Sequence, residues 1–173
     1  MRECPEKSRR DVEVREILLA RGKVTIVDDA DYNWLSQWKW HISSNGYARR
    51  KALKADGTHT TIRMHAQIIG NMPGLEPDHI NGNRLDNRRS NLRHVTHSQN
   101  LANQKKTRGT SLYKGVDFHN LTQKWQARAM KDGKRYYIGL FATEANAALA
   151  YNEVAIALFG EFARLNQLQE EAK

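Results

Sequence analysis

The chain has 173 residues, of which 39% are hydrophobic and 27% charged, a composition typical of globular proteins at a length that fits one domain or two small ones. Its net charge of +9 favours a polyanionic partner, with nucleic acid first, and a soluble protein that is merely basic is the alternative. A single cysteine, Cys4, excludes a disulfide framework within the chain and a zinc site built from several cysteines.

The beginning of the chain is polar and charged. Residues 1–14 contain no apolar signal core, and no run in the chain approaches the roughly 18 apolar residues of a membrane span. We therefore expect a polar leader over 1–14, no membrane partner and an intracellular, cytoplasmic protein.

Short strands and helices are predicted as far as residue 70. Two β-prone runs flank a turn at Arg21-Gly22, and Asp28-Asp29 is a helix start. Tryptophans at 34, 38 and 40 lie within an apolar pattern, which favours core packing over stacking on bases. The expected elements are strands over 17–19, 23–27, 40–42, 47–53 and 58–64, and helices after 28 and over 64–70.

The stretch PDHINGNRLDNRRSNLRHVTHSQN, residues 77–100, is dense in His, Asn, Asp and Arg. Asn81-Gly82 predicts a tight turn, Leu92–Val95 a short strand, and Thr96 followed by Gln99 a capping box that begins a helix. A hairpin followed by a helix can bring Asp78 and Asn100, which are 100 − 78 = 22 residues apart, back into contact. A polar loop, an enzyme site, and a zinc site of His65, His79, His94 and His97 are the open readings.

The rest of the chain reads as a compact second module. Residues 105–111 form a basic linker, and strands are predicted over 112–118, 124–131 and 134–140 with a hairpin turn at Asp132-Gly133. A helix begins after Thr143 and stops at Gly160. Its apolar positions at helical spacing are Ala148, Leu149, Ala155, Ile156 and Phe159. Three strands and one helix suit a sheet with one face covered and the other free.

The motif DHINGNRLDN…NL…VT…QN resembles that of HNH nucleases, in the homing-endonuclease variant in which Asn replaces the last His. The resemblance spans about residues 16–104. It implies an α+β fold with an N-terminal ββα-metal (HNH) nuclease module, in which His79 is the general base and Asp78 and Asn100 hold one divalent metal ion. It also implies that Asn91 braces the loop and orients His79. The catalytic set is therefore His79, Asn91 and Asn100, and the metal ligands are Asp78 and Asn100.

This chemistry agrees with the residue types. Histidine titrates near neutral pH and can take a proton from water. Carboxylate and amide oxygens suit Mg²⁺ or Mn²⁺, and no organic cofactor is expected. Neighbouring residues of a regular strand point to opposite faces, so Asp78 and His79 reach one site only if the backbone is irregular. The arginines expected to bind phosphate are Arg84, Arg88, Arg89 and Arg93.

The segments YKGV, KWQARA, YYIGLF, EANAALAYN and GEFARLN, within about 110–166, resemble the DNA-binding domain of the Apetala-two/ethylene-response-factor family. The resemblance implies a three-stranded antiparallel sheet plus one helix, with the sheet in the DNA major groove. The family's usual Arg is Asp117 here and its third-strand Trp is Tyr137, so the family's target sequence is not transferred. The expected DNA-binding residues of the linker and sheet are Lys105, Lys106, Arg108, Lys114, His119, Gln126 (or its neighbour Trp125), Arg128, Met130, Arg135 and Tyr137.

Together these patterns predict a homing-type, metal-dependent endonuclease that nicks or cuts double-stranded DNA, as phage or intron enzymes do, acting as a monomer or homodimer. The expected layout is a leader over 1–14, a nuclease domain over 15–104 with its core at about 76–104, the linker, a DNA-binding domain over 112–166 and a tail over 167–173. Two alternatives stay open: a DNA-binding regulator with an inactive nuclease module, and an RNA- or structure-specific nuclease.

Overall fold

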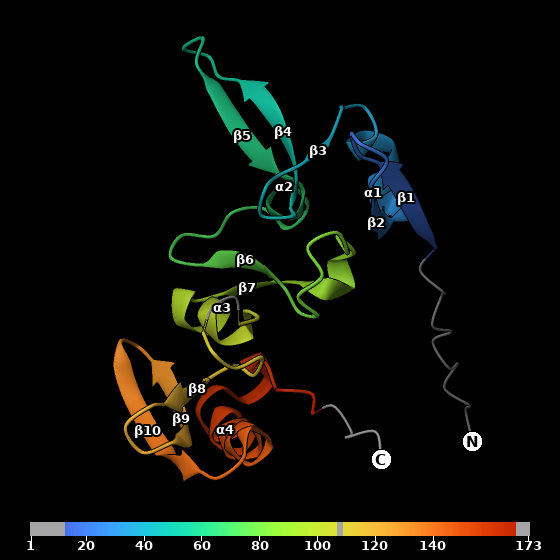
Figure 1. Ribbon diagram of the computed structural model, residues 1–173. Helices are drawn as coiled ribbons and strands as arrows, with labels where there is room; N and C mark the ends of the chain where they lie inside the picture. Colours follow the sequence, from blue (N-terminus) through green and yellow to red (C-terminus); the bar gives the residue numbers. More distant parts are fainter. Residues whose placement is uncertain (1–12, 107–108, 169–173) are drawn as a thin grey trace, which may run out of the picture. The chain divides into compact units, whose positions relative to one another are not determined.

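The computed structural model describes residues 13–106 and 109–168. Mixed helices and antiparallel sheets give the α+β class that the sequence predicted (Figure 1). The chain divides into two compact units, one of residues 1–71 and 83–93 and the other of 72–82 and 94–173. Each unit takes part of the stretch around the predicted nuclease motif, and the domain layout expected from the sequence stays a prediction.

The first unit contains a hairpin, a three-stranded sheet and two short helices. Strands β1 (Val14–Leu18) and β2 (Val24–Asp28) pair through a turn in which Arg21 and Gly22 both have φ near +72°. The sheet has the order β3-β4-β5. Its strands and the helices are β3 (His41–Ile42), β4 (Ala48–Leu53), β5 (His59–Arg63), α1 (Asp29–Leu35), α2 (Met64–Ile69) and the 3-10 turn η1 (Arg89–Asn91).

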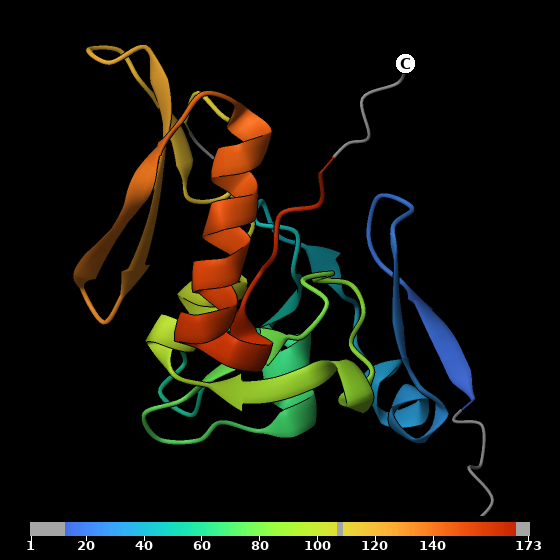
Figure 2. The same ribbon diagram turned by 90° about the horizontal axis from the view of Figure 1, so that it is seen from below.

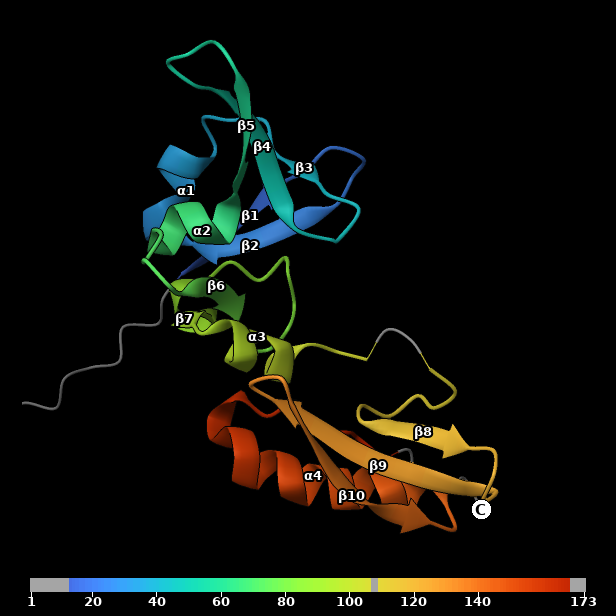
Figure 3. The same ribbon diagram turned by 90° about the vertical axis from the view of Figure 1, so that its left-hand side faces the viewer.

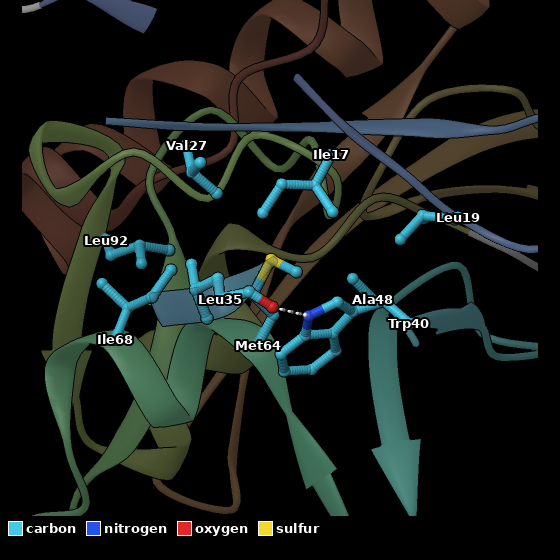
Figure 4. Packing of buried hydrophobic residues seen from close by; sticks show 9 residues of the cluster. All are labelled: Ile17, Leu19, Val27, Leu35, Trp40, Ala48, Met64, Ile68 and Leu92. Atoms are coloured by element: carbon cyan, nitrogen blue, oxygen red, sulfur yellow. Dashed lines mark hydrogen bonds between the residues drawn. The ribbon is translucent and has the colours of Figure 1, made fainter. Parts of the chain in front are cut away.

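The hydrophobic core of this unit gathers side chains from β1, β2, β4, α1 and α2 and from the segments beside them. Figure 4 shows Trp40 in this core, where its indole nitrogen donates to the carbonyl of Leu35 at 2.8 Å. Trp40 is 2% exposed, while Trp34 and Trp38 are partly buried against the core, as expected for packing residues. The core residues are Ile17, Leu19, Val27, Leu35, Trp40, Ala48, Met64, Ile68 and Leu92.

The second unit contains a strand pair, a helix and the C-terminal module. Strand β6 (Glu76–His79) pairs with β7 (Leu92–Val95), and α3 (His97–Asn103) follows. The predicted capping box at Thr96 and Gln99 is present in full and fixes where α3 begins. The C-terminal module comprises β8 (Val116–His119), β9 (Lys124–Lys131), β10 (Lys134–Phe141), α4 (Glu144–Phe159) and the 3-10 turn η2 (Gly160–Phe162).

Helix α4 covers one face of the β8-β9-β10 sheet, in which β9 is the central strand (Figures 2 and 3). Thr143 caps the helix and Gly160 ends it, as predicted. The face that packs on the sheet consists of Ala147, Ala148, Tyr151 and Ala155. Leu149 and Ile156, although apolar and at helical spacing, are 46% and 53% exposed. Small alanines let the helix approach the sheet closely, and this is why they occupy the buried face.

Candidate active site and nucleic-acid interface

The structure brings Asp78 and α3 together. Glu76 and Asp78 are two residues apart on β6 and therefore share a face of the strand. Asn100 and Asn103 are three residues apart and share a face of α3. These two faces meet. The chain thus folds back on itself by a strand, a loop, a second strand and a helix, the order of elements that the sequence predicted, while the expected contact of Asp78 with Asn100 stays a prediction.

Asn103 of α3 contacts Asp78. Its side-chain nitrogen donates to Asp78 Oδ2 at 2.9 Å and to the backbone oxygen of His79 at 2.8 Å. Asn103 and Asp78 are 7% and 8% exposed. One amide therefore holds both members of the Asp-His pair, which the sequence reasoning did not assign to it. Asn103 follows Asn100 by three residues and so lies on the same helix face, and this spacing is the sequence feature that could have indicated its contact with Asp78.

Asn100 contacts Glu76 instead. Its side-chain nitrogen donates to Glu76 Oε2 at 2.5 Å, and the other carboxylate oxygen lies 2.9 Å from Nδ1 of His97. Glu76 was also not predicted, although its position two residues before Asp78 places it on the same strand face. Because Asn100 uses its nitrogen here, its side-chain oxygen is the atom that a cation would take.

His79 is the last residue of β6 and is 3% exposed. The turn behind it closes with the Gly82 nitrogen donating to the His79 oxygen at 2.9 Å, and Gly82 has φ +69°. The regular strand therefore ends at His79. The irregular backbone expected at the Asp78-His79 pair begins only after it, at the Asn81-Gly82 turn, so Asp78 and His79 both lie within the strand.

In the first unit, the loop over 83–93 is fastened to the hairpin and to α1. The Asn87 side chain donates to Thr25 Oγ1 at 2.7 Å, and both residues are fully buried. Asn91 donates from its side chain to the Asp86 backbone oxygen at 2.8 Å, a contact of the bracing kind expected for it. The role of Asn91 in orienting His79 remains a prediction.

Arginines expected to bind phosphate make contacts within the protein. Arg89 forms a two-pronged salt bridge to Asp31 at 2.7 and 2.8 Å, which raises the pKa of its guanidinium further. Arg88 does the same to Asp86, and Arg84 donates to the Asn45 oxygen at 2.6 Å. These contacts give Arg84, Arg88 and Arg89 a structural role, and phosphate binding by them and by Arg93 stays a prediction.

The residues at the strand-helix contact suit a hard divalent cation. A nearly buried carboxylate, Asp78, lies against a helix face that carries two amide side chains, and carboxylate and amide oxygens are the ligands that Mg²⁺ and Mn²⁺ accept. Among residues 13–106 and 109–168, no three His, Cys, Asp or Glu side chains cluster as a metal site. The zinc reading, which needs His65, His79, His94 and His97, therefore has no support in the described part of the chain.

The sheet of the C-terminal module presents the expected DNA face. Register places Asp117 opposite Gln126, Arg128 opposite Tyr137, and Met130 opposite Arg135, so these side chains share the face away from α4. Met130 and Tyr137 are 60% and 62% exposed. Trp125, the alternative to Gln126, packs with the core on the other face. His119 lies on the exposed face and contacts Thr122 Oγ1 at 2.8 Å.

Asp117 occupies the middle of a charged cluster on this face. It accepts from Lys106 Nζ at 2.9 Å through one oxygen and from Arg128 at 3.0 Å through the other. Lys106 also donates to the Val116 backbone oxygen and is only 13% exposed on its side chain. Of the other predicted linker residues, Lys105 is exposed, and Arg108 lies outside the described residues.

Lys114, expected to bind DNA, is half-buried and contacts backbone oxygens of the protein itself. Its ammonium donates to the backbone oxygens of Leu101, Ala102 and Gln104. Burial, and then the nearby charge of Arg164, lower the pKa of Lys114 from 10.5 to about 8. In this arrangement the ammonium of Lys114 is hydrogen-bonded to the end of α3.

No described helix is long and apolar enough to cross a membrane.

Both halves of the chain are similar in sequence to known proteins. The HNH endonuclease family pattern matches residues 62–102. An "Uncharacterized HNH endonuclease L560" of Acanthamoeba polyphaga mimivirus is 34% identical over 155 residues, covering 87% of this chain and 80% of the viral protein. The Arabidopsis thaliana AP2-like ethylene-responsive transcription factors AIL6 and PLT2 are 37% and 43% identical over 76 and 56 residues, or 40% and 31% of this chain and 13% and 10% of their own lengths. With a relative matched along most of both chains and the motif assembled by β6 and α3, the protein belongs to the HNH endonuclease family.

Proposed function

We propose that this endonuclease is metal-dependent and of the homing type, hydrolysing phosphodiester bonds of double-stranded DNA at a site that the C-terminal sheet partly recognises. The observation that carries the proposal is the contact of the Asp78 carboxylate with α3, which gathers a carboxylate and two amide side chains beside His79. A cytoplasmic site of action, and a monomer or homodimer, belong to the same proposal.

Each residue of the set has a separate task. His79 takes a proton from the attacking water, a task that suits the imidazole side chain of histidine. Asp78 and Asn100 hold the divalent ion, Mg²⁺ or Mn²⁺, and Asn91 braces the loop from which the site is built. The ion supplies positive charge where negative charge develops on the phosphate. Asn103 keeps Asp78 and the end of β6 in place.

The sheet supplies affinity and base selection. Arg128 and Gln126 lie side by side on its exposed face, and these side chains suit guanine and adenine in the major groove. The relatives named as AP2-like transcription factors support a DNA-binding role for this module. Asp117 and Tyr137, which depart from the family pattern on the same face, support a base preference of its own.

Plasmid nicking tests the nuclease proposal. Supercoiled DNA should be relaxed or linearised with Mg²⁺ or Mn²⁺ and left intact with EDTA, and His79→Ala should lose this activity. His59→Ala, at an exposed histidine of β5, is the matched control and should cut like the wild type. DNA that is bound but never cut with any divalent metal would favour the regulator. Cleavage of RNA alone would favour an RNA nuclease.

Mapping the cut on DNA that flanks the protein's own gene tests the homing type. A homing enzyme should cleave the version of that locus that lacks the gene. Equal cleavage of both versions, or a cut unrelated to the locus, would contradict this part of the proposal while leaving the nuclease activity intact.

A further inference from the structure

The end of α3 is held by a lysine from the C-terminal module. The last carbonyl groups of a helix lack the usual partner four residues on, and at the end of α3 the ammonium of Lys114 donates to the carbonyls of Leu101, Ala102 and Gln104. The distances to the Leu101 and Gln104 oxygens are 2.9 and 2.8 Å. Asn103, the residue that contacts Asp78, lies within this same turn.

The backbone of Lys114 is itself fixed on both sides. Its nitrogen donates to Asn166 Oδ1 at 2.7 Å, and Asn166 Nδ2 donates to its oxygen at 3.0 Å. Asn166 is held in turn by Asn152 of α4, by bonds of 2.7 and 2.9 Å. Lys114 therefore projects toward α3 from a position tied to the long helix of the C-terminal module.

A second residue reaches both parts of the site. The backbone nitrogen of Arg164 donates to the Ala102 oxygen at 3.2 Å, and its guanidinium donates to the Asn81 oxygen at 2.9 Å. Asn81 lies in the turn that follows His79. Gly82 lies so close that an added Cβ would be 2.5 Å from the guanidinium. Arg164 thus links the end of α3 to the turn behind β6.

External support matters because α3 is short. A seven-residue helix is not stable alone in water, and its position depends on what packs against it. Its capping box secures the first turn, while Lys114 and Arg164 secure the last one.

We propose that Lys114 and Arg164 are positioning residues of the nuclease site. They keep the last turn of α3 and the turn after His79 in the arrangement in which Asn103 meets Asp78. The C-terminal module is therefore a structural part of the catalytic site as well as a DNA-binding module. The proposal rests on the functions proposed above for Asp78 and His79.

The decisive assay is single-turnover DNA cleavage by the full chain, with enzyme in excess and its concentration varied. Lys114→Met removes the ammonium and keeps an unbranched apolar stem. We expect the rate at saturating enzyme to fall at least about tenfold, with little change in the half-saturating concentration. Lys124→Met, at an exposed lysine of β9, is the control and should weaken binding without lowering the saturated rate. A normal saturated rate with weaker binding for Lys114→Met would make Lys114 a phosphate contact and overturn the proposal.

Arg164 provides a second variant if Lys114→Met folds poorly. Arg164→Gln should lower the saturated rate, and Arg164→Lys, which keeps one charged donor, should recover part of it. Equal rates for Arg164→Gln and the wild type would overturn the proposal for this residue.

A measurement independent of cleavage separates this proposal from the nuclease proposal. Hydrogen exchange of residues 97–104 should be faster in Lys114→Met than in the wild type, while exchange in β9 stays unchanged. Unchanged exchange in 97–104 would refute the positioning role whether or not the protein cuts DNA. Faster exchange in a protein that cuts nothing would reject the nuclease proposal alone.

Discussion

Asn103 gives the sharpest prediction about the site. Replacing it with alanine removes two hydrogen bonds from a nearly buried contact, one to the Asp78 carboxylate at 2.9 Å and one to the His79 oxygen at 2.8 Å. A hydrogen bond to a charged group contributes about 1.5–3 kcal/mol, and one to a neutral group about 0.5–1.5 kcal/mol. Allowing for water that enters the space, we expect Asn103→Ala to weaken the β6-α3 contact by about 2–4 kcal/mol.

The effect on cleavage follows from the same contact. If about half of that free energy maintains the position of Asp78 in the reacting state, the rate falls roughly 10-fold, since about 1.4 kcal/mol corresponds to a factor of ten. The saturated cleavage rate should be measured over a range of Mg²⁺ concentrations, together with thermal unfolding. Asn103→Ala should lower the rate even when the metal is saturating.

Asn100→Ala is the matched comparison on the same helix face. If Asn100 binds the metal ion, its removal should raise the Mg²⁺ concentration required for half-maximal rate. Such a shift for Asn103→Ala with no loss at saturating metal would instead make Asn103 the metal ligand. An Asn103→Ala protein with the wild-type rate, metal dependence and unfolding temperature would refute the reasoning altogether.

Three other predictions concern the C-terminal module. Gly115 has φ +74°, and an added Cβ would lie 2.1 Å from Tyr151 Cδ2. Gly115→Ala should therefore lower the free energy of unfolding, measured in urea, by about 2–4 kcal/mol. A loss below about 0.5 kcal/mol would contradict this close packing. Asp117→Asn removes the negative charge that binds Arg128, so the affinity of the protein for DNA duplexes of unrelated sequence should rise, and this affinity should depend more steeply on salt concentration. Weaker binding of DNA by this variant would instead assign Asp117 a direct role in base contact. Because the pKa of Lys114 is lowered to about 8 from 10.5, the unfolded chain binds more protons between these values, and the free energy of unfolding should rise with pH across this window. When the free energies of unfolding at pH 8 and pH 10 are compared, their difference should be smaller in Lys114→Met than in the wild type. The same difference in both proteins would contradict the lowered pKa of Lys114.

Much of the local structure follows from residues close together in the chain. Thr96 and Gln99 form the capping box that begins α3, and Asp132-Gly133 forms the β9-β10 turn with positive φ at both residues. Thr143 and Gly160 bound α4. Caps and tight turns depend on backbone bonds across two to four residues, so the sequence contains all the information that they need.

The contacts of the functional side chains were harder to predict. The sequence pointed to Asn100 as the helix residue nearest Asp78, but the structure pairs Asp78 with Asn103 and Asn100 with Glu76. Both amides lie on one helix face, three residues apart. The sequence pattern is compatible with either of them contacting Asp78. Only the register between β6 and α3 distinguishes them.

The sequence alone therefore determined the family, the α+β class and the alternation that places Gln126, Arg128 and Met130 on one face of the sheet. Tertiary structure alone decided the partners of the cations. Arg89 binds Asp31, 58 residues away, and Lys114 binds the end of α3. A lysine or arginine side chain binds whichever carboxylate or carbonyl oxygen folding brings within about 3 Å. A lysine or arginine that reads as a phosphate contact in the sequence can thus become a structural clamp in the folded protein.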